Sequence, residues 1–327
     1  MEAVARALGP RGQRDVAIGP RTTYQVGGRA ALFLEATSVE ELAALSPVLA
    51  DTGVPVLVLG RGSNLLVADA GFQGLVVSLA RHAFSAIDTA TESEGDGAFR
   101  VRAGGAVHLP VLARQTAAAG LTGLEWAVGV PGSVGGAVRM NAGGHGAETR
   151  AVMVQCRVVD LGTGRVEVMA ASELGFGYRS SLVSPRHVVV DADYQLAAGD
   201  RAESEATIRD IVRWRREHQP GGQNAGSVFV NPLGDPPANS AGWLVERAGL
   251  KGHRHGTAAV STKHANFIQA DPDGSADDVL ALMLEVQKLV GERLGVRLKA
   301  EVRLCGFPQH SLSTLGSPAP DDGVAPS

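Results

Sequence analysis

The stretch VPVLVLGRGSNLLV, residues 54–67, decides the expected fold. Val54–Leu59 is a continuous apolar run, which is typical of a strand buried on both faces of a sheet. A glycine turn, Gly60-Arg61-Gly62-Ser63-Asn64, ends this run, and a second apolar run begins at Leu65. Successive backbone N–H groups of such a turn can converge on an anion because no Cβ atoms interfere. The stretch therefore predicts a buried strand followed by a turn that could bind an anion.

The residues before this stretch complete a β-α-β unit. Ala31–Glu35 predicts a strand. Ser38 predicts the start of a helix, because Ser38-x-x-Glu41 is a capping box and apolar residues follow at helical spacing through Leu49. The alternation of strands and helices predicts a mixed α/β chain.

The residues after this stretch continue the same mixture of strands and helices. We expect strands at 75–79, 99–103, 152–160, 165–170, 187–195 and 301–304. We expect helices at 107–119 and 200–216 and one that begins at Ser275 and ends before Gly295. The chain divides by composition into segments that begin near Ile18, Gly74 and Glu217, with a flexible tail over 1–17 and a disordered tail over 308–327.

A second glycine-rich turn, Gly129-Val-Pro-Gly-Ser-Val-Gly-Gly136, could clamp a pyrophosphate together with the first. The alternative is that both turns only connect strands, since short glycine motifs occur often by chance. Neither turn ends in Gly-Lys-Ser/Thr, and neither has the G-x-G-x-x-G pattern that opens a helix. A Walker A site and a Rossmann site are therefore disfavoured.

The composition excludes several classes of protein. The 327 residues carry a net charge of −4, which argues against a general nucleic-acid binder. Two cysteines, Cys156 and Cys305, are too few and too far apart for a disulfide framework or a cysteine metal site. The sequence has no run of 18 apolar residues and no apolar signal-peptide core, so we expect a cytoplasmic protein without membrane insertion. We expect the His253–His255 stretch to bind no metal.

Several motifs in order along the chain resemble the UDP-N-acetylenolpyruvoylglucosamine reductase family, also called UDP-N-acetylmuramate dehydrogenase or MurB. They span nearly the whole chain from Thr22 to Gly306 and are LGRGSNLL (59–66), GLEWA (123–127), VPGSVGGA (130–137), MNAGG (140–144), YRSS (178–181), AGSVFVNP (225–232), KHANF (263–267) and EVR (301–303).

The resemblance implies an FAD-binding domain of the vanillyl-alcohol-oxidase type, made of two α/β subdomains, followed by a C-terminal α/β substrate-binding subdomain. On our division these are residues 18–73, 74–216 and 217–307, and the last strand near 301–305 returns to the FAD domain. The implied cofactor is FAD, with NADPH as co-substrate, and the implied FAD contacts are Gly60, Arg61, Gly62, Ser63, Asn64, Leu65, Gly129, Pro131, Gly132, Ser133, Gly135, Gly136, Asn141 and Gly143.

The resemblance also places catalytic roles on Arg179, Ser227 and Glu301. An enol ether that accepts a hydride develops negative charge on the neighbouring carbon and its carboxylate. An arginine and a carboxylic acid can stabilise that charge, and a hydroxyl can deliver the proton. Taken singly, each of the three residues is more often a loop serine or a solvated charge. The implied substrate contacts are Tyr178, Asn231, Lys263 and Asn266.

The sequence departs from the family pattern at three places. Val230 replaces a frequent lysine, His145 a frequent tyrosine, and Gln269-Ala270 a frequent Val-Asn, which puts the inherited contacts of these positions in doubt. The chain resembles the subclass that lacks a long substrate-capping loop. The expected function is NADPH-dependent, FAD-mediated reduction of UDP-N-acetylglucosamine enolpyruvate to UDP-N-acetylmuramate by a monomer.

Two alternatives remain at this point. One is an oxidase of small alcohols on the same fold, which would keep the glycine turns but need no catalytic trio. The other is a non-catalytic homologue that binds nucleotide, which the intact trio argues against.

Overall fold

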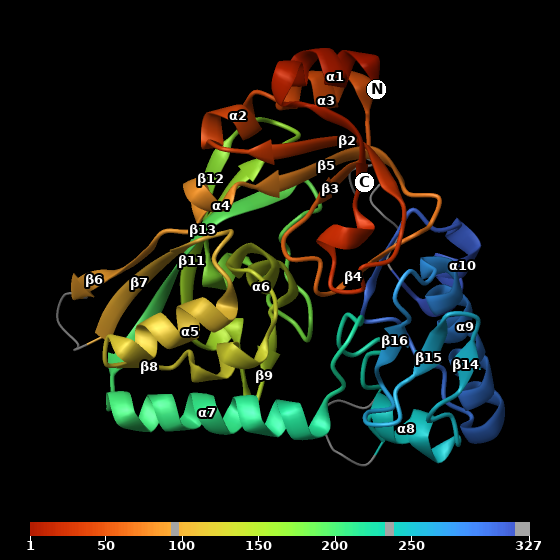
Figure 1. Ribbon diagram of the computed structural model, residues 1–327. Helices are drawn as coiled ribbons and strands as arrows, with labels where there is room; N and C mark the ends of the chain where they lie inside the picture. The colour runs from red at the N-terminus through yellow and green to blue at the C-terminus, as the bar shows by residue number, and fades with distance from the viewer. Residues whose placement is uncertain (93–97, 233–238, 318–327) are drawn as a thin grey trace. The chain divides into compact units, whose positions relative to one another are not determined.

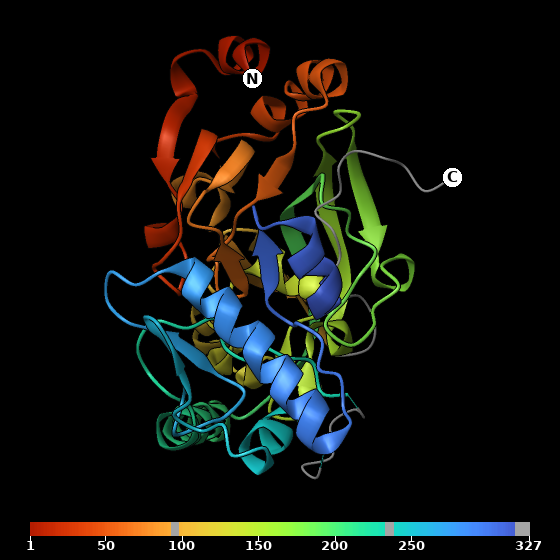
Figure 2. The same ribbon diagram turned by 90° about the vertical axis from the view of Figure 1, so that its right-hand side faces the viewer.

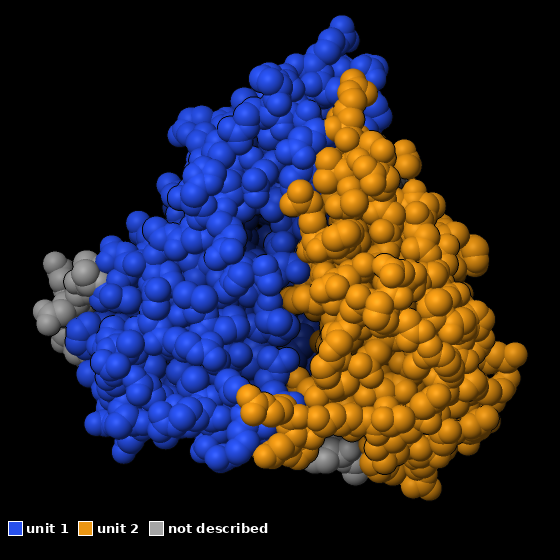
Figure 3. Space-filling model, in the orientation of Figure 1, with its two compact units in different colours: residues 1–13, 33–61, 76–215 blue, residues 14–32, 62–75, 216–327 orange. Residues whose placement is uncertain are grey.

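The computed structural model of the protein describes residues 1–92, 98–232 and 239–317. The chain divides into two compact units, coloured separately in Figure 3. Unit 1 contains residues 1–13, 33–61 and 76–215, and unit 2 contains residues 14–32, 62–75 and 216–327. The units are therefore not contiguous stretches of sequence. Residues 18–32 and 62–73, which the sequence division assigned to the first FAD subdomain, group with the C-terminal part of the chain.

Unit 1 is built on a six-stranded antiparallel sheet (Figure 1). Its strands in spatial order are β12 (Val166–Ala170), β11 (Met153–Asp160), β13 (His187–Ala198), β7 (Ala98–Gly104) and β6 (Ile87–Glu92), and β8 (Leu121–Thr122) also pairs with β13. In this register Asp193 lies opposite both Gln155 and Arg102. Polar and apolar residues alternate along the central strands, which leaves one sheet face for the core and one for charged side chains.

Helices cover the apolar face of this sheet. They are α5 (Leu109–Ala118) and α6 (Val134–Met140), joined by the 3₁₀ helix η3 (Glu125–Gly129). Pro110 lies in the first turn of α5, where its missing N–H costs no hydrogen bond. Buried residues of the two helices form one apolar cluster with Val101, Ala192 and Tyr194 of the sheet. The long helix α7 (Arg201–His218) adds Ile208 and Ile211 to the same cluster.

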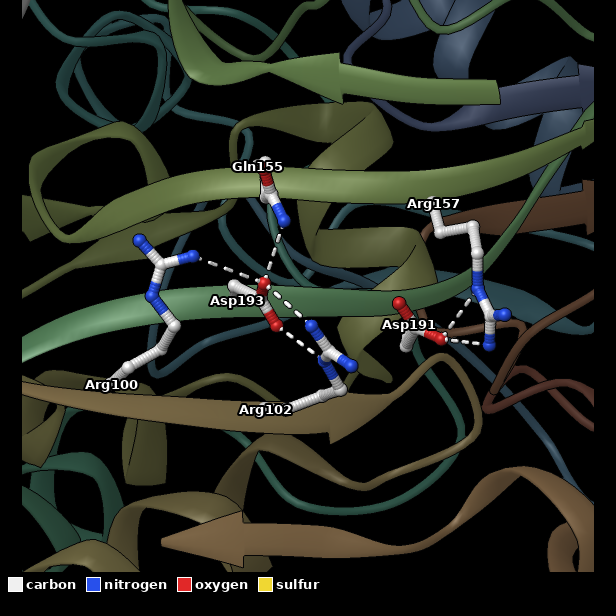
Figure 4. Close-up of polar contacts among 6 residues, drawn as sticks. All are labelled: Arg100, Arg102, Gln155, Arg157, Asp191 and Asp193. Carbon is white, nitrogen blue, oxygen red and sulfur yellow. Dashed lines mark hydrogen bonds and ion pairs between the residues drawn. The ribbon is translucent and has the colours of Figure 1, made fainter. Parts of the chain in front are cut away.

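A polar network on the other sheet face ties three central strands together (Figure 4). The Asp193 side chain is only 2% exposed and accepts hydrogen bonds from Arg102 Nε at 2.7 Å and from Gln155 Nε2 at 2.8 Å. Arg100 lies 3.5 Å from the same carboxylate, and Arg157 pairs with Asp191 beside it. Because its oxygens are paired, the buried Asp193 charge stabilises the register of β7, β11 and β13.

A four-stranded sheet contains strand β3, which lies within the apolar run Val54–Leu59 of the sequence. Its spatial order is β1 (Gln13–Ala17), β2 (Arg29–Ala36), β5 (Phe72–Leu79) and β3 (Val56–Val58). The strands of the predicted β-α-β unit are therefore separated by β5. The predicted helix is split into α2 (Val39–Ala43) and α3 (Ser46–Thr52). Ser38 caps α2 as expected, since its hydroxyl accepts from the Glu41 N–H at 3.1 Å.

Unit 2 contains a three-stranded antiparallel sheet covered by one long helix (Figure 2). The strands are β14 (Arg254–His255), β15 (Ala258–Val260) and β16 (Ile268–Ala270), and the helix is α9 (Ala276–Leu294), with α8 (Ala241–Arg247) beside it. Ser275 caps α9, and Gly295 ends it in the left-handed conformation. The last strand, β17 (Arg303–Cys305), pairs in parallel with β4 (Leu65–Val67) directly after the first glycine turn.

Two short helices lie where the sequence predicts tails. The expected flexible tail over 1–17 is wrong, because α1 (Glu2–Leu8) buries Val4 and Leu8. The expected disordered tail over 308–327 is wrong for its first part, because α10 (Gln309–Leu315) buries Leu312 and Leu315 in the unit 2 core. In both cases a few apolar residues among polar ones suffice to anchor a short helix. Residues 318–327 lie outside the described residues.

The remaining short elements connect these layers. They are η1 (Gly9–Arg11), η2 (Gly19–Arg21), α4 (Arg81–Phe84), β9 (Gly143–Gly144), β10 (Ala147–Glu148), η4 (Thr149–Ala151) and η5 (Ala171–Glu173). No helix in residues 1–92, 98–232 and 239–317 is long and apolar enough to cross a bilayer.

Candidate functional site

The two glycine turns of the sequence meet within unit 1. A Cβ atom on Gly60 would lie 2.6 Å from the Ser133 hydroxyl oxygen, which is closer than real Cβ contacts allow. A side chain on Gly60 would therefore require the Ser133 hydroxyl to move. The Ser133 hydroxyl makes no capping hydrogen bond to α6, although Ser133 is the N-cap residue. Gly60 of the first turn and Ser133 of the second therefore lie side by side, with the Ser133 hydroxyl between them.

The backbone of the second turn is partly committed to the fold. The Val134 N–H donates to the Val107 carbonyl and the Gly135 N–H to the Gly105 carbonyl, both at 2.9 Å. A Cβ on Gly135 would lie 3.2 Å from the Val189 carbonyl oxygen and 3.3 Å from that of Gly105. Gly135 therefore lets α6 approach the sheet. Its N–H is engaged by the Gly105 carbonyl, and the predicted cofactor contact of Gly135 stays a prediction.

His108 is a candidate that the sequence motifs did not indicate. It forms an isolated antiparallel bridge with Ser133, and the neighbouring Leu109 N–H donates to the Gly132 carbonyl at 3.1 Å. Partial burial lowers the pKa of His108, and the charges of Arg61 and Arg81 lower it further. A neutral imidazole beside the turns can donate one hydrogen bond. The sequence signal is only its place directly before α5.

Arg179 lies at the tip of a tight turn in unit 1. Gly177 and Ser180 exchange two backbone hydrogen bonds, of 3.1 and 3.4 Å, so Tyr178 and Arg179 are the two central residues. The φ angle of Arg179 is +53°. This conformation is usual for glycine or asparagine and costs an arginine about 1–2 kcal/mol. Tyr178 is 43% exposed, and its ring centroid lies 5.1 Å from the Arg179 guanidinium carbon.

Asn141 holds this turn through its side chain, and its predicted contact with the cofactor stays a prediction. The residue is fully buried. The Asn141 amide nitrogen donates to the Gly177 carbonyl at 2.9 Å and to the Glu148 carboxylate at 3.0 Å. The amide oxygen accepts from the Arg150 N–H at 3.1 Å. These contacts use the main hydrogen-bonding capacity of the side chain within the protein.

Ser227 and Glu301 lie on neighbouring segments of unit 2. The Glu301 N–H donates to the carbonyl of Val228, the residue after Ser227, at 2.8 Å. Phe229 and Ala300 form a bridge between the same two segments. The amide nitrogen of Asn64, from the first glycine turn, donates to the Glu301 carbonyl at 3.2 Å. Within unit 2 the structure thus brings together two of the three predicted catalytic residues, and Arg179 belongs to unit 1.

Asn266 binds the backbone of Phe229, and its predicted contact with the substrate stays a prediction. Its side chain is 3% exposed. Its amide oxygen accepts from the Phe229 N–H at 3.0 Å, and its amide nitrogen donates to the Phe229 carbonyl at 2.8 Å. The Asn266 carbonyl also accepts from the Val228 N–H at 2.9 Å. Asn266 therefore fixes the two residues that follow Ser227.

The other predicted substrate contacts lie in unit 2 with polar atoms already engaged. The Asn231 amide oxygen accepts from the Ala241 N–H at 3.0 Å, at the start of α8. The Lys263 ammonium is exposed and donates to the Arg216 carbonyl. Val230, at the position of the missing lysine, donates its N–H to the Lys299 carbonyl at 2.9 Å. These observations leave the substrate contacts as predictions.

The remaining predicted cofactor contacts are distributed around the turns. Arg61 and Pro131 are exposed, Ser63 is half-buried, and Leu65 is buried in β4. Three of the glycines lie close to another residue: Gly62 to Thr22, Gly129 to His145 and Gly143 to Glu148. Gly136 lies in the first turn of α6. Burial lowers the pKa of His145, with a further contribution from Arg215, and its ring packs edge-on against Trp214 at 5.1 Å.

His253 and His255 bind a carboxylate. His253 Nε2 lies 3.1 Å and His255 Nδ1 lies 2.6 Å from the two oxygens of Glu285 on α9. In the part of the chain that the structure describes, no three His, Cys, Asp or Glu side chains gather in a way that could hold a metal ion.

Comparison with known proteins identifies the family. Residues 30–170 match the model of an FAD binding domain, and residues 218–305 match that of the UDP-N-acetylenolpyruvoylglucosamine reductase C-terminal domain. A curated UDP-N-acetylenolpyruvoylglucosamine reductase from Rubrobacter xylanophilus is 40% identical over 309 residues, which cover 94% of this chain and 99% of the relative. The chain belongs to the UDP-N-acetylenolpyruvoylglucosamine reductase family.

Further relatives of the family agree over similar lengths. UDP-N-acetylenolpyruvoylglucosamine reductase 2 of Symbiobacterium thermophilum is 43% identical over 288 residues, covering 87% of this chain and 89% of the relative. The crystal structure of the reductase (MurB) from Thermus caldophilus matches with a TM-score of 0.74 and 35% identity, covering 90% of this chain and 99% of that one. The predicted fold, a vanillyl-alcohol-oxidase-type FAD-binding domain followed by a separate C-terminal domain, is confirmed.

The residues present fit the FAD that the reductase family implies. A dinucleotide pyrophosphate requires close backbone approach and hydrogen-bond donors around an anion. Gly60 and Ser133 lie close together, and the Ser133 hydroxyl, which does not cap α6, is a candidate donor beside the Gly60 backbone. Arg61 lies next to Gly60 in the chain and adds a positive charge there. These residues, together with the Gly132 backbone, are the ones that would hold the pyrophosphate.

Proposed function

We propose that this protein reduces UDP-N-acetylglucosamine enolpyruvate to UDP-N-acetylmuramate, with FAD as cofactor and NADPH as co-substrate, in the synthesis of peptidoglycan precursors. The observation that carries the proposal is the reductase relationship at 40% identity over 94% of the chain, with all three catalytic residue types present at the family's motif positions. The small-molecule partners are NADPH and the UDP-sugar. We further propose a monomer in the cytoplasm.

FAD held at the glycine turns would supply the redox chemistry, which is hydride transfer from NADPH to the enolpyruvyl double bond. The protein positions the substrate and stabilises charge. We assign the Arg179 guanidinium to the negative charge that develops on the substrate carboxylate. Its fixed, left-handed turn would keep the guanidinium from reorganising during the reaction.

Ser227 and Glu301 would complete the reduction. The Ser227 hydroxyl would donate its proton to the carbon next to the carboxylate, so that one hydride and one proton saturate the double bond. Glu301 would polarise the substrate carboxylate. The hydrogen bond from the Glu301 N–H to the Val228 carbonyl supports a shared role, because it holds the two backbones together. Serine is a weak acid, so this proton transfer requires a basic carbanion and a site that excludes water.

The test follows flavin absorbance under anaerobic conditions, with NADPH added first and UDP-N-acetylglucosamine enolpyruvate second. We expect bleaching by NADPH and recovery on adding the enolpyruvyl substrate. Ser227→Ala should slow only the recovery, by about 10²–10⁴-fold, the usual contribution of a positioned acid.

Other outcomes would exclude parts of the proposal. Bleaching without recovery in the wild type would point to another electron acceptor. A protein that cannot be loaded with FAD would exclude the flavoenzyme assignment. A Ser227→Ala variant whose recovery is as fast as that of the wild type would remove Ser227 as the proton donor.

A further inference from the structure

The turn that carries Arg179 holds a conformation that the arginine itself disfavours. The φ angle of +53° belongs to the left-handed region, where residues with a Cβ are uncommon. Such residues persist only where the surroundings fix them, and they concentrate at functional sites. Contacts with neighbouring residues must therefore hold this turn in place.

The C-terminal end of helix α6 fixes the turn at three points. The Asn141 amide donates to the Gly177 carbonyl at 2.9 Å, which holds the residue that opens the turn. The Ser181 hydroxyl donates to the Arg139 carbonyl at 2.8 Å, directly after the turn closes. The Arg139 guanidinium donates to the Ser184 carbonyl at 2.8 Å, further along the same loop.

Asn141 is the most specialised of these anchors. It is fully buried and ends α6 in a left-handed conformation of its own, with φ +41° and ψ +52°. Its amide oxygen is held by the Arg150 N–H, which orients the nitrogen toward Gly177. A residue at this place needs both tolerance of positive φ and an amide donor, and asparagine alone combines the two.

We propose that Asn141 is a positioning residue for reduction of the enolpyruvyl substrate: through the Gly177 carbonyl it holds the strained turn that presents Arg179. The inference rests on the proposed function of Arg179 and assigns Asn141 no contact with substrate or cofactor. Its role in the reaction passes entirely through Arg179. Loss of the amide should therefore matter only while the Arg179 guanidinium is present.

The main variant is Asn141→Gly, because glycine keeps the left-handed backbone and removes only the amide. Thr149→Val is the matched control. Thr149 is equally buried at the same end of α6, and its hydroxyl donates to the Ala142 carbonyl at 2.9 Å without touching the turn. Both variants thus lose buried hydrogen bonds in one region. The single variants are also combined with Arg179→Ala in a double-mutant cycle.

Two measurements are made on the FAD-loaded protein. Hydrogen exchange of residues 174–184, without substrate, should accelerate in Asn141→Gly and stay at the wild-type rate in Thr149→Val. Flavin reoxidation by UDP-N-acetylglucosamine enolpyruvate should slow by about 10–100-fold in Asn141→Gly, which is the scale of a displacement near 1 Å. Reduction by NADPH should change by less than about 3-fold, because it involves no substrate carboxylate.

The double-mutant cycle decides the proposal. In the Arg179→Ala background, Asn141→Gly should change reoxidation by less than about 3-fold. An equal loss in both backgrounds, or a reoxidation rate unaffected by Asn141→Gly alone, would overturn it. If Asn141→Gly does not fold, Ser181→Ala removes another anchor of the same turn and should show the same dependence on Arg179. A wild-type protein that the substrate does not reoxidise would overturn the proposed function instead, and the exchange result would then decide whether Asn141 holds the turn.

Discussion

Replacing Asn266 by leucine should destabilise the protein strongly. The amide binds both the N–H and the carbonyl of Phe229, at 3.0 and 2.8 Å, and Phe229 is only 1% exposed. Leucine has a similarly branched side chain without an amide, so both backbone groups would lose their partner. Each buried unsatisfied group costs about 1–3 kcal/mol, so the expected loss is about 4 kcal/mol.

Thermal unfolding followed by circular dichroism measures this loss. At about 1.5 °C per kcal/mol for a chain of 327 residues, Asn266→Leu should lower the Tm by about 6 °C. Gln269→Leu is the matched control. Its amide donates to the exposed Gly221 carbonyl at 2.8 Å, where water can replace it, and its Tm should fall by less than about 3 °C.

The result that would refute this reasoning is an Asn266→Leu protein that melts within about 2 °C of the wild type. The Phe229 backbone would then have found other partners, and the segment after Ser227 would not depend on Asn266. Equal losses in Asn266→Leu and Gln269→Leu would show that burial does not set the cost.

The remaining predictions concern the sheet of unit 1. Asp193→Asn should lower the free energy of unfolding by about 2 kcal/mol at pH 7 in urea titrations, because hydrogen bonds to the charged carboxylate are lost while its exposed arginine partners regain water. Burial alone would raise the pKa of Asp193, but hydrogen bonds from Arg102 and Gln155 and the arginine charges lower it overall. The carboxylate therefore stabilises the fold above the ordinary pKa of Asp, and this stabilisation disappears as the pH falls through the pKa that Asp193 has in the folded protein. The difference in unfolding free energy between wild type and Asp193→Asn should thus shrink below about pH 4. A free-energy difference that grows in acid would contradict this sign. Gly135→Ala should cost about 1–3 kcal/mol, since its Cβ would press on the Val189 carbonyl oxygen, and an unchanged unfolding midpoint would show that α6 can shift freely.

Local patterns in the sequence were sufficient for most of the secondary structure. Ser38 and Ser275 begin helices as their capping boxes predict, and Gly295 ends α9. These features depend on hydrogen bonds between residues a few positions apart, so the sequence contains all the information they need. The terminal helices α1 and α10 were missed because short segments rich in charge, Ser and Gly form helices only when a distant core buries their few apolar side chains.

The sequence by itself determined the family, the expected cofactor and the residue types available for catalysis, because these follow from motifs that are contiguous along the chain. The tertiary structure alone decided what several motif residues do. Asn141 and Asn266 belong to the motifs, yet their amides hold the backbones of Gly177 and Phe229. Gly135 lies in the predicted pyrophosphate turn, yet its N–H binds Gly105. The physical reason is that a polar side chain or N–H serves whichever partner the fold brings within hydrogen-bonding distance, and these partners lie 30 or more residues away in the sequence.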